Sequence, residues 1–324
     1  MNTYQSKEFR WRKLGNLVNP SESGIPAWIN DYVQAPNCMV YEDFVRVYFC
    51  TREPKDSRNQ YVSRVGFFDT GFENNFSNKK FSDSPVLALG PLGAFDEFGT
   101  YPFSPIRYKG KVIAAYGGWT RPEATPFDVS IGMARENSAG SDFARVANGP
   151  ILTKSLKEPF VISSPKLRFF NNQFYLFYIA GNEWVTSHSV PDPIYSIKLA
   201  VSKDGENWEK IGKNLIPDIL FQEAQASPDV IYINGTYHMF FCYRHGTDFR
   251  DNSRGYRIGY AQSQDLINWT RDDSKSDLET SDEGWDSESV SYPHVFEFKG
   301  KTYMMYLGNG VGKTGIGLAK LEDK

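Results

Sequence analysis

A pattern of apolar and polar positions recurs five times along this chain. Each copy has a proline that opens an apolar strand, a short polar turn, and a second strand rich in aromatic residues. The copies read APNCMVYEDFVRVYF from Ala35, SPIRYKGKVIAAY from Ser104, SPKLRFFNNQFYLFY from Ser164, SPDVIYINGTYHMFF from Ser227 and YPHVFEFKGKTYMMY from Tyr292. The prolines fall at positions 36, 105, 165, 228 and 293, at steps of 69, 60, 63 and 65 residues. A period of this length in a strand-rich chain predicts an array of like units.

A second pattern follows each of these hairpins. It reads YVSRVGFFDT from 61, VSIGMARENS from 129, IKLAVSKDGENWEKI from 197, YRIGYAQSQDLINWTRD from 256 and TGIGLAKLED from 314. A strand of small residues leads through a Ser-x-Asp turn to a strand that contains Trp208 in one copy and Trp269 in another. Each unit is therefore predicted to hold four short strands, as a propeller blade does.

The predicted architecture is an all-β, five-bladed β-propeller that forms a single domain over residues 1–324. The fifth unit stops after its third strand, and the segment FRWRK at 9–13 is predicted to supply the missing fourth strand. Closure of the ring by the two chain ends leaves few exposed sheet edges. The stretches near 72–92, 183–195 and 270–290 are predicted to be loops between blades. Two packed β-sandwiches also give many short strands, but they do not predict the five-fold spacing.

Composition and charge exclude several classes of function. Aromatic residues make up 15% of the chain and the mean hydropathy is −0.49, which predicts an aromatic core under a polar surface. A net charge of −3 offers no electrostatic footprint for nucleic acid or for an anionic membrane. No run approaches the roughly 20 apolar residues of a membrane span, and the N-terminus lacks the apolar core of a secretion signal. Cys38, Cys50 and Cys242 are expected to be buried thiols in a reducing compartment, so we expect a cytoplasmic protein.

The repeated motifs resemble those of the five-bladed glycoside hydrolases of families 43 and 32, with relatives in families 117 and 130. The similarity lies in the X-Pro hairpins with Gly-x-Tyr (Gly235 and Tyr237 in one copy) and in the turn Ser-x-Asp-Leu-x-x-Trp from Ser263 to Trp269. In those families an Asp of the first blade acts as base or nucleophile, a Glu of a later blade acts as acid, and a further Asp tunes the pair. The Asp of the first blade usually stands directly before the proline, where this chain has Ala35. The resemblance therefore implies a divergent branch.

Asp31 and Glu223 are the predicted catalytic carboxylates. Asp31 lies in Trp-Ile-Asn-Asp, which is similar to the family 32 opening, and it stands five residues before Pro36. Glu223 stands five residues before Pro228, and the equal offset suggests equivalent places in two blades. Glycosidic cleavage needs a proton donor and a carboxylate base or nucleophile, roles that these two residues are predicted to fill. The alternatives are a turn-capping Asp and a solvated loop Glu.

Two further acidic segments precede strands. Asp96 and Glu97 lie between two Phe residues; Asp96 is the predicted third catalytic group, and Glu97 is expected to contact substrate. Glu288 also stands five residues before its proline and is a reserve carboxylate. Trp285 is expected to stack on a sugar ring, or else to pack between blades.

The remaining predicted substrate contacts are aromatic and basic. Arginines at the ends of second hairpin strands (Arg52, Arg121 and Arg244, followed by Arg250, Arg254 and Arg257) indicate an anionic substrate or phosphate, unless they form surface ion pairs. His294 follows a proline and points into the channel or packs in the core. The full set of predicted binding residues is Glu97, Tyr101, Trp119, Arg121, Trp184, Arg244, Trp285, Glu288 and His294. No Asp/Glu/His cluster has metal-ligand spacing, so no metal or other cofactor is expected.

The leading functional prediction is an enzyme that cleaves a glycosidic bond of a small glycan, with anionic and activated glycans among the candidates. Its expected partner is carbohydrate, and neither nucleic acid nor a membrane is expected as a partner. A phosphorylase or a glycosyl-transferring enzyme that uses phosphate or a sugar nucleotide is the second prediction. A non-catalytic sugar-binding propeller is the third. No Gly-x-Ser-x-Gly elbow and no phosphate-binding loop at the start of a helix occurs.

Overall fold

The computed structural model describes residues 9–322 apart from 72–75, 77, 138–141, 188–189 and 250–253. This part of the chain is built from β-strands, with short helical turns at η2 (Asp273–Lys275) and α1 (Asn309–Gly312). The predicted all-β class is therefore confirmed. Within the same residues, we find no helix of the length and apolarity that crossing a membrane requires.

The strands form antiparallel ladders of four. Three ladders are separate sheets in the described residues, with the orders β1–β20–β19–β18, β10–β11–β12–β13 and β14–β15–β16–β17. Their strands are β1 (Trp11–Val18), β10 (Ile162–Phe170), β11 (Gln173–Ser187), β12 (Val190–Ser202), β13 (Glu209–Lys210), β14 (Ala224–Ile233), β15 (Thr236–Arg244), β16 (Arg257–Ser263), β17 (Trp269–Arg271), β18 (Ser291–Phe298), β19 (Lys301–Leu307) and β20 (Ile316–Leu321).

The remaining strands form one eight-stranded sheet that contains two ladders, β2 to β5 and β6 to β9. A single parallel pair, Ser63 with Gly99, joins the two ladders. The strands are β2 (Asp31–Val40), β3 (Val45–Arg52), β4 (Ser63–Thr70), β5 (Lys79–Phe81), β6 (Gly99–Tyr108), β7 (Lys111–Thr120), β8 (Asp128–Glu136) and β9 (Phe143–Arg145).

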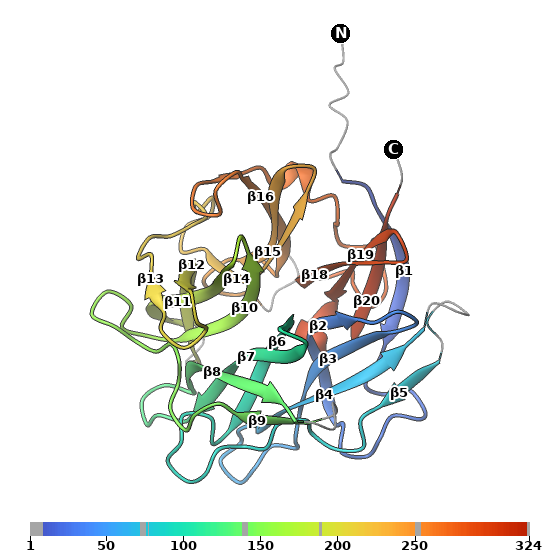
Figure 1. Cartoon of the computed structure of the whole chain (residues 1–324). Helices are drawn as coiled ribbons and strands as arrows, with labels where there is room; N and C mark the ends of the chain where they lie inside the picture. Colours follow the sequence, from blue (N-terminus) through green and yellow to red (C-terminus); the bar gives the residue numbers. More distant parts are fainter. Residues whose placement is uncertain are drawn as a thin grey trace.

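The N-terminal strand completes the last ladder. β1 pairs antiparallel with β20, from Trp11 opposite Leu321 to Val18 opposite Ile316, and Figure 1 shows the blue strand beside the red one. The predicted strand at 9–13 thus exists, although it starts at Trp11 and runs further. Because both chain ends contribute to one sheet, the edge of β20 is covered.

The innermost strands of the ladders form a closed circle (Figure 1). β2, β6, β10, β14 and β18 each contact the next, and β18 contacts β2. Among the described residues, a hydrophobic cluster lies between every two neighbouring ladders. The cluster with Val47 of β3 and Met305 of β19, for example, joins the first ladder to the last. Apolar burial between ladders therefore holds the circle together.

A β-bulge interrupts each innermost strand at an X-Pro pair. Pairing shifts between residues 34 and 37, 100 and 103, 163 and 166, 226 and 229, and 291 and 294. In the second ladder the bulge falls at Tyr101–Pro102, whereas Pro105 lies in regular pairing with Ala114. The choice of Pro105 as the repeat position was therefore wrong. The equivalent prolines lie at 36, 102, 165, 228 and 293, at the more even steps of 66, 63, 63 and 65 residues.

These bulges turn the repeated prolines toward one axis. Pro36, Pro102, Pro165, Pro228 and Pro293 all line one small cavity of about 20 Å³. At four of the five bulges the residue before the proline has a left-handed backbone, with φ between 47° and 52°. This conformation costs a non-glycine residue about 1–2 kcal/mol. Packing of the strands around the axis maintains it.

Candidate functional site

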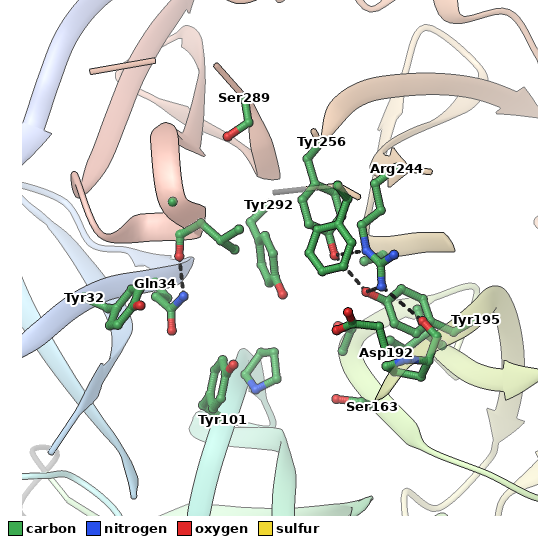
Figure 2. A pocket seen from close by; sticks show the side chains of 18 of the residues that line it. Tyr32, Gln34, Tyr101, Ser163, Asp192, Tyr195, Arg244, Tyr256, Ser289 and Tyr292 are labelled. Carbon is green, nitrogen blue, oxygen red and sulfur yellow. Dashed lines mark hydrogen bonds between the residues drawn. The ribbon is translucent and has the colours of Figure 1, made fainter. Parts of the chain in front are cut away.

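A larger cavity of about 450 Å³ adjoins the proline axis and shares Pro102, Ser164 and Tyr292 with the small axial cavity. Every ladder contributes side chains to it, as Figure 2 shows for Tyr32, Tyr101, Asp192, Arg244 and Tyr292. The starts of the innermost strands and the ends of the second strands form its walls. The circular arrangement of the strands therefore creates one pocket from residues distant in sequence.

The cavity walls are largely aromatic. Tyr101 and Trp119 stack with ring centroids 5.1 Å apart and planes 8° from parallel. The Trp119 Nε1–H donates to the Tyr101 carbonyl oxygen at 2.6 Å, which fixes the orientation of the indole. Both residues were predicted substrate contacts, and both line the cavity. The other aromatic lining residues are Tyr32, Phe127, Tyr195, Phe249, Tyr256 and Tyr292.

Arg244 and two tyrosines make a rigid wall on the opposite side (Figure 2). Arg244 is buried, and its Nε donates to the Tyr256 hydroxyl at 3.1 Å. Its two terminal nitrogens donate to the carbonyl oxygens of His245 and Pro193 at 2.8 and 3.0 Å. Tyr195 and Tyr256 join their hydroxyls at 2.7 Å, and burial raises the pKa of Tyr256 well above its usual range. The Tyr256 hydroxyl therefore stays protonated, and the Arg244 guanidinium is held by hydroxyl and carbonyl oxygens.

Among the residues that the structure describes, Asp192 and Glu288 are the acidic residues in the cavity lining. Asp192 is buried, and Figure 2 shows its carboxylate directed into the cavity. Glu288 was a predicted reserve carboxylate. Its backbone N–H and that of Ser289 donate to Asn309 Oδ1 at 2.8 and 3.3 Å, which holds the segment in place.

The position of Asp192 depends on an unusually long hairpin. β11 and β12 remain paired out to Ser187 opposite Val190, well beyond the length of the other hairpins. The prediction of a loop at 183–195 was therefore wrong. The Arg244 Nη2–H bond to Pro193 ties the extension to the cavity wall.

Glu223 lies outside the cavity lining and holds an outer strand. It is 1% exposed, and its Oε1 accepts from Arg271 Nη1 at 2.6 Å, on the outermost strand β17. Its Oε2 accepts from the backbone N–H groups of Ile219 and Leu220 at 3.1 and 3.2 Å. Both oxygens are therefore occupied by protein donors. The predicted acid role of Glu223 has no support from this placement.

The same arrangement recurs in other ladders and includes Asp96. The buried Asp96 carboxylate accepts from Tyr116 on the second strand at 2.9 Å and from Arg145 on the outermost strand at 2.6 Å. Glu158 bonds Tyr178 and Lys210 in the third ladder, and Asp286 bonds Tyr306 and Lys13 in the last. We call these sets the acid clamps. They join the segment before an innermost strand to the outer edge of its ladder, so Asp96 is placed for structure and not within the cavity.

Asp31 and Glu223 do not occupy equivalent places. β2 has an additional shift in pairing between Asp31 and Gln34, where Tyr32 has φ 71°. Asp31 is opposite Arg52 in the first ladder, and Ala224 is opposite the equivalent Arg244 in the fourth. Asp31 therefore corresponds to Ala224, the residue after Glu223. Asp31 is exposed beside the cavity residue Tyr32 and is not itself among the lining residues.

The other predicted contacts also divide between cavity and scaffold. Arg244 and Glu288 line the cavity, whereas Glu97 accepts from the Gly93 N–H at 2.7 Å in a loop. Arg121 lies one residue beyond β7 and pairs with Asp56 at 2.5 Å, and Trp184 contacts the lining residue Phe127 at 5.5 Å. Trp285 lies outside the cavity lining, where it packs on Tyr306 of its own ladder at 5.3 Å and against the hydrophobic cluster between the fourth and fifth ladders. Of the other arginines, Arg52 lines the cavity, Arg254 and Arg257 bind backbone oxygens, and Arg250 lies outside the described residues.

Several lining residues were not predicted from the sequence, among them Tyr32, Gln34, Ser163, Asp192, Tyr195 and Lys313. A simple signal exists for three of them. Gln34, Ser163 and Ala226 each stand two residues before a repeated proline, directly before the bulge. In three of the five ladders, the corrected proline register therefore marks a position that lines the cavity.

Below the cavity, the residues that follow three of the prolines form a buried charged network. Asp229 accepts from Lys166 at 3.3 Å and from Arg168, and it lies 3.0 Å from His294 Nδ1. The Cys38 backbone N–H donates to His294 Nε2 at 2.9 Å, and His294 Nδ1 lies 3.0 Å from Lys166 Nζ as well as from Asp229 Oδ2. His294 is therefore an axial core residue and does not line the large cavity.

This network predicts a specific dependence of stability on pH. Burial, followed by the charge of Lys166, lowers the pKa of His294 to about 4, against the attraction of Asp229; Arg168 adds to the repulsion. Between about pH 6.5 and 4 the unfolded chain binds a proton at this residue and the native protein does not, so stability falls as the pH falls through this window. Relative to His294→Gln, wild type is expected to lose on the order of 2 kcal/mol between these pH values, measured by urea unfolding. Parallel pH profiles of the two proteins would contradict this assignment.

Within the described residues, no group of three or more His, Cys, Asp or Glu side chains has the geometry to hold a metal ion.

Comparisons with known proteins give the fold a context. No known family model matches the chain. Over 315 residues, 97% of this chain and 99% of the relative, it is 29% identical to the uncharacterized protein Rv1502 of Mycobacterium tuberculosis H37Rv. Over 135 residues, 39% of this chain and 43% of the relative, it is 32% identical to a β-1,2-mannobiose phosphorylase of a Thermoanaerobacter strain.

Solved structures are similar over nearly the whole chain. A glycoside hydrolase gives a TM-score of 0.76 at 18% identity, covering 98% of this chain and 93% of that one. A thermostable family-43 glycoside hydrolase gives 0.64 at 14% identity, covering 93% and 91%. A structure reported for family-130 mannoside phosphorylases, which contain glycoside hydrolases acting on β-1,2 mannosidic linkages, gives 0.69 at 14% identity, covering 99% and 95%. The predicted resemblance to propeller-type glycoside hydrolases of families 43, 32 and 130 is thus confirmed for the fold, at identities that fit a divergent branch.

Proposed function

We propose that this chain is a glycoside-active enzyme built as a five-bladed propeller, and that the 450 Å³ cavity binds its saccharide substrate. Five ladders, a closed circle of innermost strands and five prolines around one axis support the blade count. The observation that carries the function is the cavity itself, where aromatic walls and two carboxylates converge from different blades. Concave, mostly apolar sites with a few placed polar groups are typical of small-ligand pockets.

Asp192 and Glu288 are the proposed working carboxylates. Cleavage of a glycosidic bond requires one group to protonate the leaving oxygen while another assists attack on the anomeric carbon. Asp192 and Glu288 line the cavity, whereas Glu223 and Asp96 are engaged in acid clamps. Asp31 remains a proposal for a contact at the rim, beside Tyr32.

A turnover screen tests the proposal. Wild-type protein is incubated with aryl glycosides and disaccharides of several hexoses, with and without phosphate, and the products are separated by chromatography. Release of free sugar indicates hydrolysis, and release of sugar 1-phosphate only with phosphate indicates phosphorolysis. Trp119→Ala, which removes one aromatic wall, is expected to lower kcat/KM at least about 10-fold. Trp208→Ala is the matched control, because Trp208 is also half-buried but lies outside the cavity lining.

Two results would count against this function. Saccharide binding without any turnover favours the non-catalytic sugar-binding propeller. Neither binding nor turnover across the panel contradicts the carbohydrate function as a whole.

A further inference from the structure

Arg52 stands half-buried in the cavity wall without an acidic partner. Its Nε donates to Gln34 Oε1 at 2.9 Å and one Nη to the Tyr101 hydroxyl at 3.3 Å. Its guanidinium lies over the rings of Tyr32 and Tyr61, at 4.6 and 5.2 Å from their centroids. All of these contacts are neutral, and among the residues that the structure describes no carboxylate lies within ion-pair distance of Arg52.

Asp31 is the acid that the strand pairing brings nearest, since it is opposite Arg52 in the ladder. It nevertheless forms no ion pair with the guanidinium within the described part of the chain. The tyrosine rings and the neutral oxygens stabilise the guanidinium, but none of them neutralises its charge. The positive charge of Arg52 is therefore available to a ligand in the cavity.

Lys313 adds a second positive charge to the same cavity. Its loop is pressed against β2: the Gln34 side-chain amide donates to the Val311 carbonyl oxygen, and Gly312 has φ 88°. A Cβ at Gly312 would meet Gln34 Cγ and the Val33 carbonyl oxygen at 2.7 Å each. This close approach holds the loop that carries Lys313 beside Gln34, the residue that accepts a hydrogen bond from Arg52. Within the described residues, the Lys313 ammonium also has no acidic partner.

Asp192 lies across the cavity from Gln34 and Tyr101 (Figure 2). Figure 2 shows Tyr32, Gln34 and Tyr101 on one side, and Asp192, Tyr195 and Arg244 on the other. On the second side Arg244 already donates to carbonyl and hydroxyl oxygens from each of its nitrogens. On the first side, Arg52 and Lys313 have no acidic partner among the described residues. We call the set Arg52, Lys313, Gln34 and Tyr101 the cationic corner.

We infer that the cationic corner binds an anionic group of the saccharide substrate, a carboxylate or a phosphate. The inference rests on the proposed carbohydrate function and specifies the substrate class. A guanidinium fork pairs with either oxyanion through parallel hydrogen bonds, and Lys313 adds a point charge. Tyr101 links the corner to the stacked wall at Trp119, so a sugar ring on that wall carries its charged substituent toward Arg52.

Calorimetric titration with matched probes tests the inference. For each of glucose, galactose and mannose, the neutral sugar, the uronate and the 1-phosphate are compared, together with inorganic phosphate alone. At least one anionic sugar is expected to bind 10-fold or more tightly than its neutral counterpart. Arg52→Gln is expected to reduce that affinity by about 10- to 100-fold, the factor that one or two charge-assisted hydrogen bonds represent. Preference for uronate, sugar phosphate or free phosphate identifies the source of the anion.

Controls separate charge recognition from folding. Arg135→Gln removes an arginine that pairs with Glu206 on the outer surface, and it is expected to leave binding unchanged. Arg52→Lys keeps the charge without the fork and is expected to have intermediate affinity, and unfolding midpoints confirm that all variants are folded. Equal binding of neutral and anionic sugars, or an Arg52→Gln variant with wild-type affinity for anions, overturns the inference and leaves the glycoside function standing. Absence of all saccharide binding and turnover overturns the proposed function itself.

Discussion

Asp192→Asn is expected to lower kcat/KM for the glycoside substrate by at least about 100-fold, while the protein remains folded. A positioned general acid or base contributes 10²–10⁴ to the rate, and an amide of the same shape can neither donate an acidic proton nor accept one. Asp192 is buried and directed into the cavity, which makes it the better placed of the two lining carboxylates. The measurement is steady-state kinetics on whichever substrate the screen identifies. Glu288→Gln is expected to reduce turnover in the same assay.

Glu223→Gln is the informative counterpart, because sequence resemblance and three-dimensional placement disagree about this residue. Its ion pair with Arg271 fastens β17, so the variant is expected to lose about 1–3 kcal/mol of stability. Turnover at a temperature where the variant is folded is expected to stay within about threefold of wild type, a change of under 1 kcal/mol. An inactive Glu223→Gln variant of normal stability, with an active Asp192→Asn variant, would restore the sequence-based assignment. Asp31→Asn in the same series tests the rim position.

The circular fold was predictable because its signal is local and repeated. Each unit encodes an apolar strand, a turn and an aromatic strand, and residues so patterned pair with their sequence neighbours. The pairing of β1 with β20 followed from the incomplete last unit. The error at Pro105 arose because Tyr101–Pro102 and Ser104–Pro105 both precede apolar residues, and only the pairing register shows which pair forms the bulge.

The site was less predictable because an acidic residue before a strand has two possible destinations. Such a side chain either turns toward the axis or reaches outward to a cation on the outermost strand. Asp96 and Glu223 reach outward, and the evidence was present in the sequence as a later basic residue of the same unit, Arg145 or Arg271. Asp192 was not predicted as a lining residue because Pro191 and Pro193 make its segment look like a loop. Both prolines nevertheless lie in the paired part of an extended hairpin, near its tip.

Asp229→Asn is expected to cause the largest loss of stability, about 3–5 kcal/mol, the range for removing one partner of a buried ion pair. Asp229 is fully buried and is the carboxylate that faces Lys166 and Arg168, while His294 contributes a further hydrogen bond. Those cations hold the pKa of Asp229 below its usual range despite burial. An amide in its place leaves the buried ammonium of Lys166 without a counter-charge.

The double variant Asp229→Asn/Lys166→Met distinguishes charge imbalance from simple loss of packing. Burial, opposed by Asp229, already lowers the pKa of Lys166 to about 8, so its ammonium depends on that carboxylate. Removing both charges is therefore expected to recover part of the stability that Asp229→Asn loses, in urea unfolding at pH 7. Asp69→Asn, which breaks a half-buried pair with Arg46 at 2.7 Å, is the matched control and is expected to cost only about 1 kcal/mol. If the double variant is less stable than Asp229→Asn alone, the axial residues act through packing, and the charge network is not what stabilises the centre of the ring.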